Sequence, residues 1–354
     1  MNRHRFSVSL LAAALASAAA ADIPRTADGT PDLSGYYDVA TLTPVDRPQI
    51  FGDSAFLTVE QAKEIEERAA KAMAEGSADL AADRGAPPVG GDGSPGAAGN
   101  VGGYDSFWID NGERNFEIDG KFRTSIVYDP PNGRRPAMTP EAQERAKARR
   151  SFWRENTGTA WWLENDGPGP YDDVELRPLA ERCLLGFSST GGPPMMPALY
   201  NNHKRIVQTP DHIMILTEMV HDARIVRMNA DHAPGEVRRW LGDSVGYWEG
   251  DTLVVDTTNF NDTPALGLAT RDLHVVERFK RVDAETLLYS FTVEDANVWE
   301  APWSGEYPWP ATDEPVYEYA CHEGNYSLGN ILRGARRLEA EALAAGAELA
   351  AGAE

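Results

Sequence analysis

Eight short segments in the C-terminal half of the chain combine β-branched, aromatic and leucine residues with tight joins, and this series constrains the fold more than any other feature. Joins such as Thr209-Pro210-Asp211 and Glu249-Gly250-Asp251 carry turn residues. Residues 286–294 alternate apolar and polar side chains, with Leu288 as the exception, as a strand with one buried face does. The expected strands are 204–209, 212–218, 223–228, 244–249, 252–258, 273–281, 286–294 and 315–320.

Consecutive strands with short joins form an antiparallel meander, and eight of them predict a mainly β fold. The favoured form is an up-and-down, lipocalin-like barrel whose interior holds one small ligand. A flattened sandwich is the alternative, and the sequence leaves it open. We expect this antiparallel β domain to span residues 204–328, with a helix and tail following at 329–354.

Residues 22–203 predict a more irregular region with two helices. Thr58 and Gln61 have the spacing of a capping box, which indicates a helix over 58–76. Thr139, followed by a proline, begins a second helix that reaches Arg150. A hairpin is expected to turn at Asp119-Gly120, and residues 76–103 form a low-complexity loop of Gly, Ala, Pro and Asp. Peripheral helices and loops therefore precede the β domain.

The first 21 residues have the layout of a cleavable export signal. Arg3 and Arg5 form the basic start, an apolar run follows, and small residues lead to Ala21. The run is too short and too rich in alanine to span about 30 Å of hydrocarbon. We therefore expect cleavage near Ala21, a periplasmic or secreted location, and no membrane insertion.

The formal net charge of −22 narrows the class of partner. Such an acidic protein is repelled by nucleic acid and by anionic lipid. A neutral or cationic small molecule is therefore the expected partner, and nucleic acid is not.

Cys183 and Cys321 are the two cysteines of the chain. In an oxidising compartment an even pair predicts one disulfide, which here would close a long loop. The alternative is a catalytic thiol at Cys321, beside His322. The oligomeric state is left open.

Eight short phrases are spread along the chain: PDLSG (31–35), RTSIVYDPP (123–131), ERCL (181–184), YNN (200–202), WLGDS (240–244), WEGDTLVV (248–255), HVVERF (274–279) and CHEGNY (321–326). Together they resemble a family of exported bacterial proteins that are usually described as hypothetical, and the likeness covers roughly residues 30–335 apart from the low-complexity loop. This resemblance implies export and carries no assigned activity or catalytic residue.

Motifs for cofactor chemistry are missing from the sequence. It has no Walker loop, dinucleotide glycine fingerprint, paired CxxC, CxxCH haem site, HExxH zinc helix or GxSxG nucleophile elbow. The histidines of the mature chain have no close metal-ligand spacing. We therefore expect no cofactor and no metal, which leaves acid–base chemistry or simple binding.

His221, Asp222 and Arg224 lie at the join between the second and third expected strands, with Glu218 just before them. An imidazole, two carboxylates and a guanidinium in one turn suit a proton relay. The alternative is a solvated turn whose charges pair with one another.

His322 and Glu323 follow Cys321 after the last expected strand. A disulfide at Cys321 would hold both side chains firmly, for catalysis or as a structural clasp. We include them with the polar turn as candidate catalytic residues.

Alternation along 273–281 places His274 on one face and Glu277 on the other, among apolar residues. A carboxylate on an apolar face is either a cavity acid with a raised pKa or a buried ion-pair partner, and we favour the ion pair. The full set of candidate substrate-binding residues is Trp240, Asp243, Tyr247, His274, Glu277 and Trp303.

In a meander, joins after odd-numbered strands lie at one end of the barrel and joins after even-numbered strands at the other. The long joins 229–243, 259–272 and 295–314 would then form an aromatic mouth near His274. His221 and His322 would cluster at the opposite end. The sequence thus proposes two sites, of which we favour the His221/His322 cluster.

The first hypothesis for function is a cofactor-independent lyase, isomerase or hydratase acting on a small hydrophobic molecule, aromatic or terpenoid. His221 or His322 would transfer the proton, Asp222 or Glu323 would orient the imidazole, and Arg224 would stabilise developing negative charge. The alternatives are a non-catalytic periplasmic binding protein for such a ligand and an envelope protein-interaction module whose Trp-Pro loops dock a partner.

Overall fold

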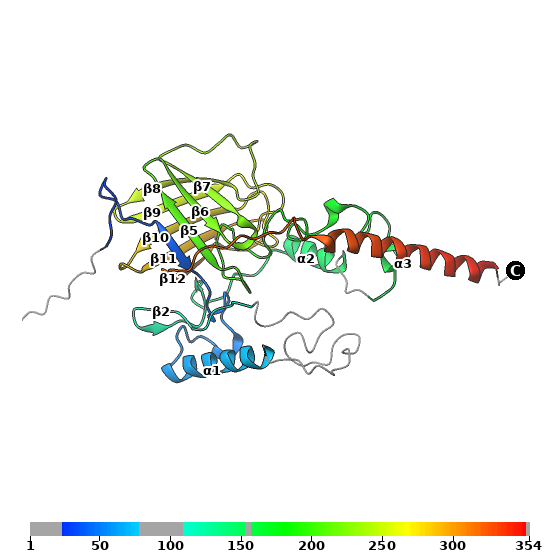
Figure 1. Cartoon of the computed structure of the whole chain (residues 1–354), viewed down its shortest axis with the longest axis horizontal. Coiled ribbons are helices and arrows are strands. Elements are labelled where there is room, and N and C mark those ends of the chain that lie inside the picture. Colours follow the sequence, from blue (N-terminus) through cyan, green and yellow to red (C-terminus); the bar gives the residue numbers. More distant parts are fainter. Residues whose placement is uncertain (1–22, 78–108, 153–156, 352–354) are drawn as a thin grey trace, which may run out of the picture.

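The computed structural model describes residues 23–77, 109–152 and 157–351. The expected signal segment and most of the low-complexity loop lie outside these residues. The fold is mainly β: one ten-stranded, mostly antiparallel sheet curls into an open half-barrel, with three helices in the described part of the chain (Figure 1).

The sheet has the strand order β1-β5-β6-β7-β8-β9-β10-β11-β12-β4. Two strands of the N-terminal region thus form its edges, and the eight between them come from the C-terminal half. A separate two-stranded hairpin, β2 (Glu117–Ile118) with β3 (Lys121–Phe122), turns at the expected Asp119-Gly120. The strands of the sheet are β1 (Gly35–Asp38), β4 (Val127–Asp129), β5 (His203–Gln208), β6 (His212–Thr217), β7 (Ala223–Met228), β8 (Asp243–Glu249), β9 (Thr252–Thr258), β10 (His274–Arg281), β11 (Thr286–Glu294) and β12 (Trp303–Pro310).

The first seven expected strands correspond to β5 through β11, whereas the eighth was wrong. Residues 315–320 have no strand, and the segment that carries the Trp-Pro residues is β12 instead. Glu306 donates its backbone N–H to Ile126, on the β4 side of β12. Because backbone direction alternates along a strand, Pro308 and Pro310 face that same side, beyond the end of β4. Their missing N–H groups therefore cost no hydrogen bond to β11.

β7 and β8 pair in parallel, so the sheet is not a simple meander. The chain crosses back over residues 229–242 before β8 begins. Fully buried Asp243 anchors this crossover, because its carboxylate accepts hydrogen bonds from Arg227, His232 and Arg239 and from the Ala233 N–H.

This parallel pair corrects the expectation of two separate ends. With β8 running in the same direction as β7, the joins 259–273 and 295–302 lie at the same end of the sheet as the 218–222 turn. The sheet is also open and has ten strands, where a closed barrel of eight was expected.

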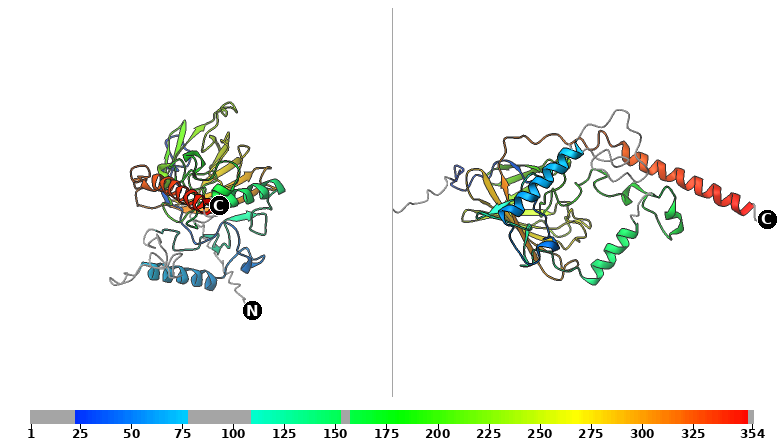
Figure 2. Two further views of the ribbon diagram at one scale, coloured as in Figure 1. Left: turned by 90° about the vertical axis from the view of Figure 1, so that its right-hand side faces the viewer. Right: turned by 90° about the horizontal axis from the view of Figure 1, so that it is seen from below.

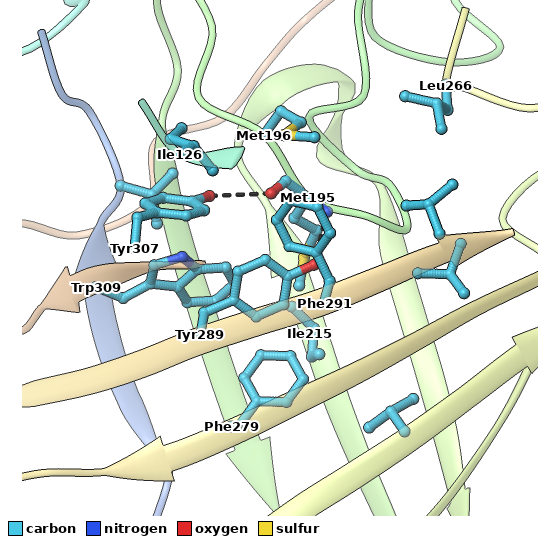
Figure 3. Close-up of a cluster of buried hydrophobic side chains, with 14 of the residues drawn as sticks. Ile126, Met195, Met196, Ile215, Leu266, Phe279, Tyr289, Phe291, Tyr307 and Trp309 are labelled. Carbon is cyan, nitrogen blue, oxygen red and sulfur yellow. Dashed lines mark hydrogen bonds between the residues drawn. The ribbon is translucent and has the colours of Figure 1, made fainter. Parts of the chain in front are cut away.

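Aromatic side chains fill the concave face of the sheet, where the sequence had suggested room for a ligand. Tyr289, Tyr307 and Trp309 are fully buried there against Phe279. The loop 188–196 enters this face, and Met195 anchors it. The Tyr307 hydroxyl donates to the Met195 carbonyl (3.0 Å), and the Met195 N–H donates to the Tyr289 hydroxyl (2.9 Å; Figure 3).

The helices lie outside the sheet (Figure 2). α1 (Val59–Gly76) begins with the expected Thr58/Gln61 capping box, and α2 (Pro140–Phe152) is capped by the Thr139 hydroxyl. α3 (Tyr326–Ala351) extends away from the sheet and packs Ala335 and Leu338, near its middle, against Trp162. None of the described helices has both the length and the apolar character that a membrane span requires.

Candidate functional site

A cleft of about 1000 Å³ opens at the end of the sheet where β5 begins and β6 finishes. The segment between β12 and α3 forms one wall, and the loops around 181–183 and 200–201 form the other. The lining residues are Asp110, Ala180, Glu181, Cys183, Tyr200, Asn201, His203, Glu218, Glu314, Tyr317, Glu318, Tyr319, Ala320, Cys321, Gly324, Asn325, Ser327, Leu328 and Ile331.

His203 and Glu218 form an ion pair on the cleft. They face each other across the β5–β6 pair, where the Glu218 N–H donates to the His203 carbonyl (3.0 Å). His203 Nδ1 lies 3.4 Å from Glu218 Oε2, and both side chains are nearly buried, with 12% and 6% exposed. The other carboxylate oxygen of Glu218 accepts the Tyr317 N–H (3.3 Å). The carboxylate therefore holds both the imidazole and the far wall.

The pairing shifts both pKa values in opposite directions. The hydrogen bond that His203 donates to Glu218 raises the pKa of His203, and burial opposes this only in part. Burial acts to raise the pKa of Glu218, but the hydrogen bond and charge of His203 outweigh it, so the Glu218 pKa lies below its ordinary value. Both shifts favour an imidazolium beside a carboxylate more than the two groups would alone.

Further carboxylates surround this pair. Glu314 Oε2 lies 3.8 Å from His203 Nε2, and Glu318 and Asp110 also line the cleft. Burial, together with the nearby Asp38, raises the pKa of Asp110. Among the described lining residues there is no lysine or arginine, so the cleft has a strongly negative potential.

This arrangement has the parts of an acid–base site. A nearly buried carboxylate holds one imidazole nitrogen, and the other lies 3.8 Å from Glu314, which also lines the cleft. A histidine held in this way on a cleft can give or take a proton. Across the residues that the structure describes, no group of three or more His, Cys, Asp or Glu side chains is spaced to hold a metal ion.

The polar turn expected to be catalytic lies at the edge of this cleft but is not assembled as expected. His221 is exposed, and its Nδ1 is 3.0 Å from the Tyr319 carbonyl of the wall. His322 and Glu323 are exposed on the turn that follows Cys321. Within the described part of the chain, no hydrogen bond or ion pair joins His221 to either of them.

Asp222 and Arg224 point into the concave face instead of the cleft. Arg224 is buried and forms a bidentate ion pair with fully buried Glu277, which also accepts the Tyr289 hydroxyl (2.8 Å). Of the two interpretations offered for Glu277, the buried ion-pair partner agrees with this geometry. Since Arg224 is committed to this pair, it does not face the cleft. Burial raises the pKa of Asp222, which packs against Gly191, to about 6.

The expected substrate-binding residues are dispersed. Asp243 is the buried anchor of the crossover, and Trp303 is fully buried in the core. Tyr247 is 41% exposed and lies outside the cleft, as does the half-buried Trp240. His274 bridges Asp256 and Glu294 on the sheet (Nε2–Oδ1 3.1 Å, Nδ1–Oε2 3.6 Å). The Trp-Pro segment offered for docking is buried too, at Trp299, Trp303 and Trp309.

The expected disulfide between Cys183 and Cys321 is present, with a Cα–Cα distance of 5.8 Å. Both cysteines line the cleft, and neither is free. The alternative of a catalytic thiol at Cys321 was therefore wrong.

Sequence reasoning counted His203 among the histidines but did not select it, although a signal was present. The tight turn at 210–211 sets the register of the first hairpin, in which Lys204 pairs with Thr217. Extending that register by one position places His203 opposite Glu218. A histidine opposite a glutamate at the open end of a hairpin predicts a cross-strand ion pair.

No family model, curated protein or solved structure matches this chain. The resemblance drawn from the sequence phrases stays a prediction, and the site is interpreted from its own geometry.

Proposed function

We propose that this protein is an exported, cofactor-independent acid–base enzyme, a lyase, isomerase or hydratase, whose active site is the cleft at His203. The observation that carries the proposal is the His203–Glu218 pair on a cleft of about 1000 Å³. His203 transfers the proton, and Glu218 orients the imidazole and stabilises its charged form. This assignment replaces His221 and His322 as the proton-transfer residues.

The raised pKa of His203 sets the direction of the chemistry. A raised pKa favours the protonated imidazole, which suits a first step as general acid toward a leaving group or a double bond. The imidazole then recovers a proton from water or from the product. A reaction that eliminates, adds or moves a group next to a double bond needs this one exchangeable proton and no electron carrier.

The lining of the cleft supports a small substrate that is neutral or cationic and has an apolar body. Tyr200, Leu328 and Ile331 offer contact surface for an aromatic or terpenoid group, as expected from the sequence. Glu314 and Glu318 repel anions, which agrees with the overall charge of −22.

A second candidate is a binding protein without chemistry, favoured by the carboxylates themselves. Asp110, Glu314 and Glu318 line a cleft together with Tyr200 and Tyr317, and carboxylates beside aromatic rings suit an amine or a quaternary ammonium group. In that case Glu218 and His203 would line the cleft without transferring a proton.

The compartment we propose is the periplasm or the exterior, after cleavage near Ala21. The Cys183–Cys321 bond supports an oxidising environment outside the cytoplasm.

The test incubates the mature chain, residues 22–354, with a panel of neutral and cationic aromatic and terpenoid compounds. Mass spectrometry follows both soluble products and compounds retained by the protein. We expect a new product whose rate of formation falls about 10²–10⁴-fold in His203→Gln. His212→Gln is the matched control, because His212 is exposed on β6 outside the cleft and its loss leaves the rate unchanged.

A compound retained unchanged by the wild type would favour the binding protein instead. A product that persists at the wild-type rate in His203→Gln would contradict the assignment of His203.

A further inference from the structure

The wall of the cleft between β12 and α3 is a strap, defined as residues 313–325. It contains no strand, and none of its residues, all of which the structure describes, is buried. It nevertheless supplies much of the lining of the cleft, including Glu314, Tyr317 and Tyr319. A segment that buries no side chain gains little from packing, so its local opening costs little free energy.

Hydrogen bonds hold the strap to the sheet at the turn between β6 and β7. The Tyr317 N–H donates to Glu218, and His221 Nδ1 bonds to the Tyr319 carbonyl (3.3 and 3.0 Å). The turn itself is strained, because Val220 and His221 have φ values of +57° and +47°. A β-branched residue is costly in this region, and such strain marks functional segments.

The Cys183–Cys321 disulfide is the covalent tie of the strap. It joins the strap to the opposite wall, and both cysteines line the cleft, so a reductant that enters the cleft reaches the bond. Cys183 is only 6% exposed, whereas Cys321 is half-buried. The Cys321 side of the bond is therefore the side open to thiol exchange, which a bond sealed in a core would not be.

We propose that the strap is a redox-controlled gate: reduction of the Cys183–Cys321 bond by a dithiol opens the wall of the cleft and exposes the His203 side. One thiolate of the dithiol attacks a sulfur of the bond and expels one cysteine as a thiolate. Its second thiolate attacks the resulting mixed disulfide and expels the other cysteine. The dithiol becomes a cyclic disulfide, and the two cysteines leave as thiols after taking up two protons. That the gate regulates an enzyme rests on the proposed function. The opening of the strap on reduction does not.

Hydrogen exchange read by mass spectrometry tests the gate on the mature chain without any ligand. The protein is compared in its oxidised form and after treatment with dithiothreitol under native conditions. We expect amides of residues 313–325 to exchange about tenfold faster or more after reduction, while amides of β8–β11 keep their protection. Treatment with oxidised dithiothreitol is the control and leaves exchange unchanged.

Two results would overturn the gate. Strap amides that exchange equally fast in both forms would mean that the bond does not control the wall. Loss of protection in the strap and in β8–β11 together would mean that the bond holds the whole fold. Cys321→Ser without reductant must reproduce the reduced pattern. Hydrogen exchange needs no substrate. A failure of the gate can therefore be distinguished from a failure to find a product of the proposed enzyme.

Discussion

His203 and Glu218 occupy facing positions at the open end of the first hairpin of the sheet, with Nδ1 of one 3.4 Å from Oε2 of the other. The pKa of His203 is raised, so its contribution to stability is complete below the unfolded value of 6.5 and is lost as the pH rises through the folded value. The pKa of Glu218 is lowered, so its contribution is present above 4.5 and is lost as the pH falls through the folded value.

The pair therefore stabilises the fold most between these limits, in mildly acidic to neutral solution. We expect the difference in free energy of unfolding between wild type and His203→Gln to be largest there and to shrink on both sides. Urea denaturation at a series of pH values measures it. A difference that grows steadily with pH would contradict the pairing.

We expect the stability of the fold to depend strongly on keeping both partners of the buried Arg224–Glu277 pair. Glu277→Gln leaves a buried guanidinium without its counter-charge, which costs about 3–5 kcal/mol of stability. The double variant Arg224→Met/Glu277→Leu removes both charges and is expected to lose less than Glu277→Gln alone. Chemical denaturation of the three proteins checks this order. The reverse order would mean that the charges do not depend on each other.

Because Lys204 is buried, we expect its contribution to the free energy of unfolding to rise with pH, whereas that of His203 falls. It is fully buried and donates to the Thr190 carbonyl (2.9 Å), and burial lowers its pKa from 10.5 to about 7. Between these values the unfolded chain binds more protons, so the free energy of unfolding rises with pH by up to about 1.4 kcal/mol per unit. We expect this rise in wild type relative to Lys204→Met, measured from pH 7 to 9. Parallel profiles for the two proteins would show that Lys204 stays charged.

Asp243 is expected to be the residue on which the crossover most depends. Asp243→Ala removes the hydrogen bonds that its buried carboxylate accepts, those from Arg227 and Arg239 among them, and should cost about 1.5–3 kcal/mol. Asp262→Ala is the matched control, because the Asp262–Arg271 pair is exposed and should cost less than about 1 kcal/mol. Thermal and urea unfolding compare the two. Equal losses would contradict the anchoring role.

Local patterns in the sequence predict much of this fold, and the failures have physical causes. Alternation and turn residues locate β5 through β11 because those signals are short-range. They do not reveal that β7 and β8 are parallel, since the crossover between them is held by side-chain bonds to Asp243 that no alternation pattern shows. β12 was missed because Pro308 and Pro310 normally exclude a strand, and here their missing N–H groups face the β4 side, beyond the end of β4.

For the candidate site, too, some features could be predicted from the sequence and others could not. Cys183 and Cys321 were paired correctly because two cysteines allow a single pairing and the sequence predicts an oxidising compartment. His221 was favoured for its charged neighbours in sequence, yet the side chain opposite His203 decides which imidazole is held by a carboxylate. That relation follows from strand register, which a single turn sets over a whole hairpin.

The most direct test of the central claim is an NMR titration of the His203 imidazole in wild type and in Glu218→Gln. The account predicts a pKa above 6.5 in wild type, because the hydrogen bond to Glu218 favours the charged ring. It predicts a lower pKa in Glu218→Gln, because the amide supplies no counter-charge. A wild-type pKa at or below 6.5 that Glu218→Gln leaves unchanged would contradict a proton-transfer pair in this cleft.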